Sequence, residues 1–109
     1  MANSYKFKGV ALATTNETSL LTSGSKEVLI VKSIRITNNT GNTPTISMDV
    51  LDSSQSNAEF TILKTQSLTA NSSVEILTVP LVLENSDILK ATISSSDSIH
   101  IGISYLNIT

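Results

Sequence analysis

The sequence predicts an all-β fold: an antiparallel β-sandwich of jelly-roll type, with about eight strands in a single domain over residues 1–109. Three observations predict it. Apolar and polar residues alternate with a period of two along most of the chain. Turn-forming clusters of Ser, Asn, Asp and Gly separate these stretches about every dozen residues. No long segment carries apolar residues at helical spacing.

The first expected strand lies close to the N-terminus. Tyr5 and Phe7 alternate with Lys6 and Lys8, and the apolar positions then change parity at Gly9. We expect a β-bulge at this glycine, because one extra residue in a strand reverses the side on which later side chains lie. The two lysines are typical of the solvated edge of a sheet.

The remaining strands follow from the same alternation, and each ends at a turn-forming cluster. The clearest is the C-terminal one, in which isoleucines at positions 99, 101 and 103 alternate with polar residues. The expected strands cover residues 5–12, 18–22, 27–37, 45–51, 58–64, 73–78, 88–94 and 99–108.

Three segments break the alternation because apolar residues fall on both parities, at 28–31, at 81–83 and at 106–108. A bulge near Lys32 in a central strand explains the first of them. The alternative is that a partner chain covers the second face, because a sandwich strand buries only one parity in its own core. The candidate interface residues are Leu29, Val31, Leu81, Leu83, Leu106 and Ile108.

Composition excludes several classes of function. The absence of cysteine excludes disulfides, thiol nucleophiles and cysteine-based zinc sites. A net charge of -2 without clustered Lys and Arg predicts no nucleic-acid partner. No apolar run approaches the ~20 residues needed to cross a bilayer, and residues 1–6 do not resemble a signal peptide, so we expect no membrane partner.

The sequence also lacks the arrangement of an active site. His100 is the only histidine, and a Ser-His-Asp triad with Asp97 would need an exposed nucleophile turn such as G-x-S-x-G, which does not occur. We therefore expect His100 on a solvent-facing side of its strand. The chain is predicted to be no enzyme and to need no cofactor.

Two carboxylate pairs, Asp49 with Asp52 and Glu84 with Asp87, are possible calcium ligands. Their spacing does not match an EF-hand loop, and both pairs are more simply interpreted as strand-end and turn residues. We therefore predict no metal site.

Aromatic residues bear on sugar binding, because carbohydrate sites usually stack a sugar on an exposed ring. Tyr5, Phe7, Phe60 and Tyr105 all fall on apolar parities, where the pattern places side chains in the core. This disfavours a carbohydrate site, and we expect no small-molecule ligand.

The layout as a whole resembles the small virion proteins of tailed bacteriophages, particularly those of marine and cyanobacterial hosts. The resemblance lies in the Tyr-Lys-Phe-Lys strand at 5–8, the segments 31–38 and 81–90, and the C-terminal strand ending at 108–109. The family often has an acidic-Gly turn before the penultimate strand, whereas residues 84–87 here read Glu-Asn-Ser-Asp. The family has no catalytic residues to transfer.

The resemblance implies a non-enzymatic structural protein of the virion, made in the host cytoplasm. We expect a homo-oligomeric capsid decoration or cement subunit, whose partners are the major capsid protein or other virion proteins. One alternative is a structural protein of the neck or tail. A second alternative, of another class, is a carbohydrate-binding module on a host-recognition appendage.

Overall fold

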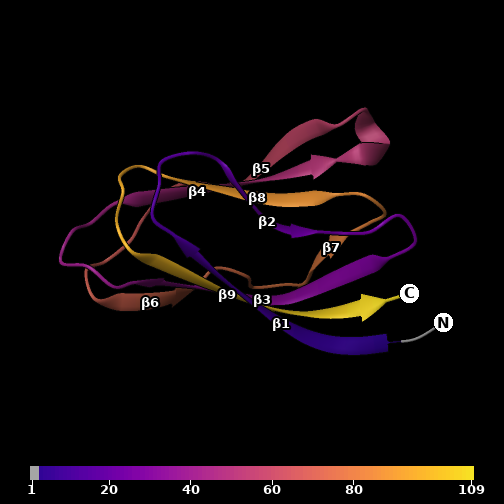
Figure 1. Cartoon of the computed structure of the whole chain (residues 1–109), viewed down its shortest axis with the longest axis horizontal. Coiled ribbons are helices and arrows are strands. Elements are labelled where there is room, and N and C mark those ends of the chain that lie inside the picture. Colours follow the sequence, from indigo (N-terminus) through magenta and orange to yellow (C-terminus); the bar gives the residue numbers. More distant parts are fainter. Residues whose placement is uncertain (1–2) are drawn as a thin grey trace.

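The computed structural model describes residues 3–109 and confirms the predicted antiparallel β-sandwich, with its two sheets stacked as layers (Figure 1). Residues 1 and 2 of the expected domain lie outside the described residues. A three-residue 3-10 turn, η1 (Ser53–Gln55), interrupts the strands, and no described helix is long and apolar enough to cross a bilayer. The strands are β1 (Asn3–Leu12), β2 (Thr18–Thr22), β3 (Val28–Asn38), β4 (Thr45–Asp52), β5 (Ala58–Ser67), β6 (Ser72–Glu75), β7 (Leu81–Leu83), β8 (Ile88–Ile93) and β9 (Ile99–Ile108).

The five-stranded sheet has the order β1-β9-β3-β6, with β7 also pairing with β3, and the four-stranded sheet has the order β2-β8-β4-β5. The first and last described strands are therefore neighbours, and the beginning of β1 lies beside the end of β9, where Asn3 pairs with Ile108 (Figure 1). The residue pattern missed β7 as a separate strand. With three residues it is too short to show an alternation, and only its pairing with β3 defines it.

One hydrophobic core lies between the two sheets. Strands β4 and β8 alternate between buried and half-buried positions, and each turns one parity inward. Fully buried side chains such as Met48, Leu89 and Ile101 each stabilise the fold by about 1.5–3 kcal/mol through removal of apolar area from water.

The bulge predicted near Lys32 is present. The register between β3 and β9 shifts between Val31 and Ser33, so one extra residue lies in β3. As a result Val31 before the bulge and Ile34 after it both point into the core, although they lie three residues apart.

The bulge predicted at Gly9 was wrong. The register between β1 and β9 is unbroken along the whole of β1. Tyr5 and Phe7 therefore lie on the side of the sheet opposite to Val10 and Leu12, with their rings on its outer face. The apolar residues change parity at Gly9 because those in the first half of β1 lie on the outer face of the sheet and those in the second half lie on its inner face.

Glu75, at the end of β6, holds the bulge in place. One carboxylate oxygen accepts from the Ser33 hydroxyl, and the other accepts from the backbone N–H of Ile34 at 2.8 Å and of Leu77 at 3.3 Å. Burial raises the pKa of Glu75, but these three hydrogen bonds and the charge of Arg35 outweigh it and hold the pKa below its ordinary value.

Replacement of Glu75 with Gln should lower the Tm at pH 7 by about 3–5 °C, because the N–H of Ile34 and the Ser33 hydroxyl lose a charged acceptor. A folded-state pKa below the unfolded one stabilises the protein above the unfolded pKa, and this contribution disappears as the pH falls through the folded pKa. The difference in Tm between wild type and Glu75→Gln should therefore shrink in acid. Thermal melts from pH 7 to pH 3 test this, with Glu84→Gln as the control at an exposed turn. A difference that stays constant with pH would contradict it.

Candidate interaction surface

The outer faces of the two sheets differ in character. On the four-stranded sheet the register sets Lys90 beside Asp49 and Thr92 beside Ser47, so this face is polar. On the five-stranded sheet several apolar side chains point outward. An apolar surface that faces outward is not buried in the core of its own chain. Such surfaces often mark the place where another molecule binds.

A continuous apolar row crosses four strands on this outer face. Tyr5 of β1 pairs with Leu106 of β9, Leu106 pairs with Ile30 of β3, and Ile30 pairs with Val82 of β7. Tyr5 is 78% exposed and Val82 is 50% exposed, whereas the two aliphatic residues between them are half-buried. We call these four residues the apolar row.

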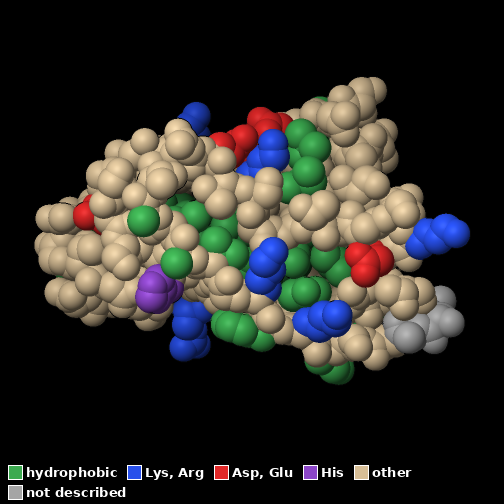
Figure 2. Space-filling view, viewed as in Figure 1, with side chains coloured by type: hydrophobic (Ala, Val, Ile, Leu, Met, Phe, Trp, Pro, Cys, Tyr) green, Lys and Arg blue, Asp and Glu red, His purple; other side chains and the backbone are tan. Residues whose placement is uncertain are grey.

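The apolar surface extends on both sides of this row. Ile108 pairs with Val28 in the next row toward the termini, and Phe7, which is 70% exposed, lies on the other side. Figure 2 shows hydrophobic side chains projecting from the edge of the molecule where Figure 1 places β1. Monomeric proteins rarely expose a contiguous surface of this kind. The whole apolar patch consists of Tyr5, Phe7, Val28, Ile30, Val82, Leu106 and Ile108.

Beside the patch, two glycines leave a hollow in the same face. Gly9 pairs with Gly102, which in turn pairs with Arg35, and we call these three residues the glycine row. The Phe7 ring lies over Gly102, because a Cβ built there would be 2.9 Å from Phe7 Cε1. The hollow is an open groove of about 680 Å³, whose lining also includes His100 and Thr37.

His100 is exposed on this face, as predicted. Asp97 accepts hydrogen bonds from the Ser95 hydroxyl and from Asn42 Nδ2, and these two bonds lower the pKa of Asp97. The carboxylate is therefore engaged by other residues and does not form the orienting hydrogen bond that a triad with His100 would require.

The candidate interface residues divide into two groups. Leu29, Val31 and Leu83 are buried in the core, and Leu81 is half-buried and packs against it. Leu106 and Ile108 lie half-buried on the outer face. The sequence carried a signal for three further residues of the patch. Val28, Ile30 and Val82 lie in the segments that are apolar on both parities, at the positions that face outward.

The expected burial of the aromatic residues was wrong for three of the four. Tyr5, Phe7 and Phe60 are more than half exposed, and only Tyr105 packs against the core. Phe60 shares the inner side of its sheet with its partner Val50 but lies on β5, an outermost strand, where the other sheet leaves it half exposed. Tyr5 and Phe7 of β1, the outermost strand of the other sheet, point to the outer face, as their partners Leu106 and Ser104 do. An apolar position on such a strand does not ensure burial.

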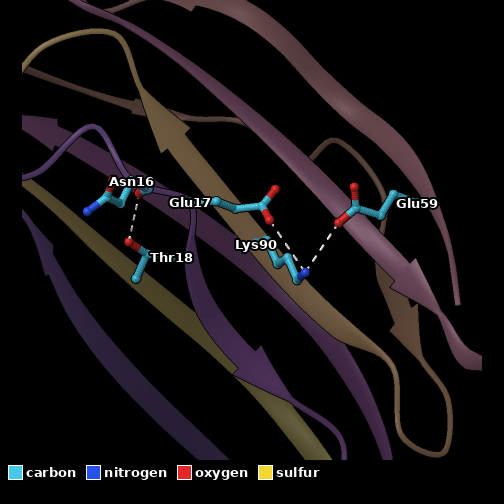
Figure 3. Close-up of polar contacts among 5 residues, drawn as sticks. All are labelled: Asn16, Glu17, Thr18, Glu59 and Lys90. Atoms are coloured by element: carbon cyan, nitrogen blue, oxygen red, sulfur yellow. Dashed lines mark hydrogen bonds and ion pairs between the residues drawn. The ribbon is translucent and has the colours of Figure 1, made fainter.

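A cluster of charges lies on the opposite, polar face. Oxygens of Glu17, Asp49 and Glu59 lie within 4.8 Å of one another. Lys90 lies between two of them, with Nζ 3.2 Å from Glu59 and 3.4 Å from Glu17 (Figure 3). The hydrogen bond to Glu59 is the main cause that raises the pKa of Lys90. An ammonium group thus already compensates these carboxylates.

Of the two carboxylate pairs, Asp52, Glu84 and Asp87 are strand-end or turn residues, whereas Asp49 lies inside β4 and belongs to the charged cluster. Asp52 accepts from the N–H and hydroxyl of Ser54 and caps η1. Asp87 is buried and accepts from the N–H of Ser53 at 3.0 Å and from the N–H of Glu84 at 2.9 Å, so it ties two turns together.

No family model matches the sequence, and no curated protein sequence matches it significantly. Solved structures share its fold. The core of Drosophila NLP, a protein described through its pentamer formation and histone binding, aligns with TM-score 0.56 and 16% identity over 94% of this chain and 98% of that chain. The nucleoplasmin-like N-terminal domain of Drosophila FKBP39 aligns with TM-score 0.56 and 14% identity over 96% and 91%.

A viral chain shares the fold as well. A chain in the structure of infectious bursal disease virus, Gx strain, aligns with TM-score 0.58 and 8% identity over 96% of this chain. This chain matches only 32% of the viral one. At these identities the likeness establishes the fold.

The Tm of the wild type should be the same in millimolar calcium and in EDTA, because Lys90 occupies the place of a cation among the three carboxylates. Removal of the ammonium in Lys90→Ala leaves those carboxylates close together, and calcium should then raise the Tm of the variant by mass action. Lys26→Ala, at an exposed lysine in a turn, is the matched control. A calcium-dependent Tm in the wild type would show that one of the carboxylate groups does bind the ion.

Proposed function

We propose that this chain is a non-enzymatic structural protein of a tailed-phage particle, a capsid decoration or cement subunit that acts through protein–protein contacts. The observation that carries the proposal is the apolar patch on the outer face of the five-stranded sheet. The sequence resemblance to small virion proteins supports it, and so does the occurrence of the fold in a viral chain. A position in the neck or tail would use the same contacts.

The chemistry of the patch suits a protein partner. Its β1 edge carries two exposed rings, Tyr5 and Phe7, and aromatic residues are enriched in protein interfaces. Burial of each ring against a partner would contribute about 1.5–3 kcal/mol. None of the seven residues is charged, so binding through the patch should depend little on salt.

The location can be tested on phage particles purified by density gradient from a host culture in which this chain is produced. Mass spectrometry should find the chain in intact particles at a fixed ratio to the major capsid protein. The double variant Tyr5→Ser/Leu106→Ser should be lost from the particles while its Tm stays within a few degrees of wild type. Phe60→Ser, which removes an exposed ring from the other sheet, should be retained. Absence of wild-type chain from intact particles would overturn the proposal.

A second candidate function, carbohydrate binding, gains one observation in its favour. Phe7 offers an exposed ring beside a groove whose polar lining includes Arg35 and His100, and sugar sites combine such a ring with nearby hydrogen-bonding groups. The neighbouring aliphatic side chains Leu106 and Ile30 fit a sugar poorly. We therefore rank this function second.

Titration with soluble oligosaccharides tests this candidate through tyrosine fluorescence, because the chain has two tyrosines and no tryptophan. If the structural role is correct, the signal of Tyr5 should not change. Saturable binding that disappears in Phe7→Ser would favour the carbohydrate function instead.

A further inference from the structure

The outer face of the five-stranded sheet carries a ridge and a hollow at matched positions. A central row, in which Phe7 pairs with Ser104 and Ser104 with Ser33, runs across the strands. The apolar row lies two residues along each of β1 and β9 to one side of it, and the glycine row lies two residues to the other side. Ridge and hollow are therefore equally distant from the central row, about 7 Å along a strand.

We propose that this face binds the same face of a second copy of the chain about a two-fold axis that runs along the central row. The proposal rests on the proposed function: a dimer held through the apolar patch is the unit that would enter the particle. Rotation about that axis reverses the direction along the strands and keeps the position across them. Tyr5 of each copy then lies over the open groove at Gly9 of the other, and the Phe7 rings, each of which covers Gly102 of its own chain, meet near the axis.

Symmetry favours this pairing over a one-sided contact. A two-fold interface requires a surface that is complementary to itself, and a face that carries a ridge and an equal hollow on opposite sides of one line satisfies this requirement. Glycine inside a strand often marks a place where another chain approaches closely. Gly102 accommodates the Phe7 ring of its own chain, whereas a Cβ at Gly9 would meet that ring only at ordinary contact distance, so the space over Gly9 is open to a second copy.

The available area is sufficient for a dimer. Three strands of about ten residues, β1, β9 and β3, with the short β6 and β7 beside them, are spaced about 4.8 Å apart and present a face of roughly 600 Å². Two copies would bury about 1,200 Å² in total, at the lower limit of stable, specific interfaces.

The charges are also compatible. Arg35, its neighbour Glu75 and His100 lie on the glycine side of the central row, and the rotation places each of them opposite uncharged residues of the second copy. Lys6 and Lys8 occupy the alternate positions of β1 and point away from this face. No like charges meet across the axis.

Analytical ultracentrifugation of Gly9→Val provides the sharpest test. A Cβ at Gly9 meets only the Phe7 ring, at 3.6 Å, and the backbone there is ordinary strand, so the variant should fold. Its side chain fills the hollow, and the dimer should weaken by about 100-fold or more in Kd, an effect that corresponds to about 2.7 kcal/mol. Gly41→Val, in an open turn, should dimerise like wild type.

The two possible modes of association respond to this change in opposite directions. If apolar side chains simply adhered to one another, valine at position 9 would enlarge the apolar surface and strengthen association. Stronger association of Gly9→Val, a monomeric wild type or a five-copy ring would each overturn the proposal.

A cross-linking experiment locates the axis. The native chain has no cysteine, so Ser104→Cys places a single thiol on the central row of each copy. Because packed sheets lie about 10 Å apart, too far for a disulfide, a short bismaleimide reagent should link the two thiols. Ser19→Cys, exposed on the outer face of the other sheet, should stay unlinked. Equal cross-linking of both variants would contradict the axis. A chain found in phage particles but monomeric in solution would refute this inference and leave the proposed function standing.

Discussion

The bulge at Lys32 is the constraint on which both faces of the five-stranded sheet depend. Because of the bulge, the apolar side chains of β3 before and after it both point into the core. The bulge therefore also determines which residues of β3 face outward. The Ile34 N–H at the irregular point finds its partner in Glu75, so a single carboxylate from a short neighbouring strand completes the ladder. A buried amide without a partner would oppose the bulge; this one has a charged acceptor.

The sequence was sufficient for the fold class and for most strands, because a period of two is set by burial of one face. It also located the bulge at Lys32, where two apolar parities meet within one strand. It failed at Gly9 for a physical reason: the same parity change arises when a strand is apolar outside and then inside. Period alone does not distinguish a bulge from a change of face.

The candidate surface could be found only in part for the same reason. The segments around positions 29, 82 and 106 were identified as doubly apolar, but the parity that faces outward depends on strand pairing. Tyr5 and Phe7 were placed in the core because the apolar parity of their strand was taken to face inward. The facing pair of glycines depends on the register of β1 with β9, which joins residues about as far apart in the chain as its length permits.

The pairing of β1 with β9 affects how the chain folds during its synthesis. The apolar row takes Tyr5 from the first described strand and Leu106 from the last, so neither half of the chain contains the surface by itself. During synthesis, β1 leaves the ribosome early and must wait for β9 before it has a neighbour, because such long-range pairing forms late. The outer apolar surface thus forms only when the fold is complete, and an unfinished or truncated chain would lack it.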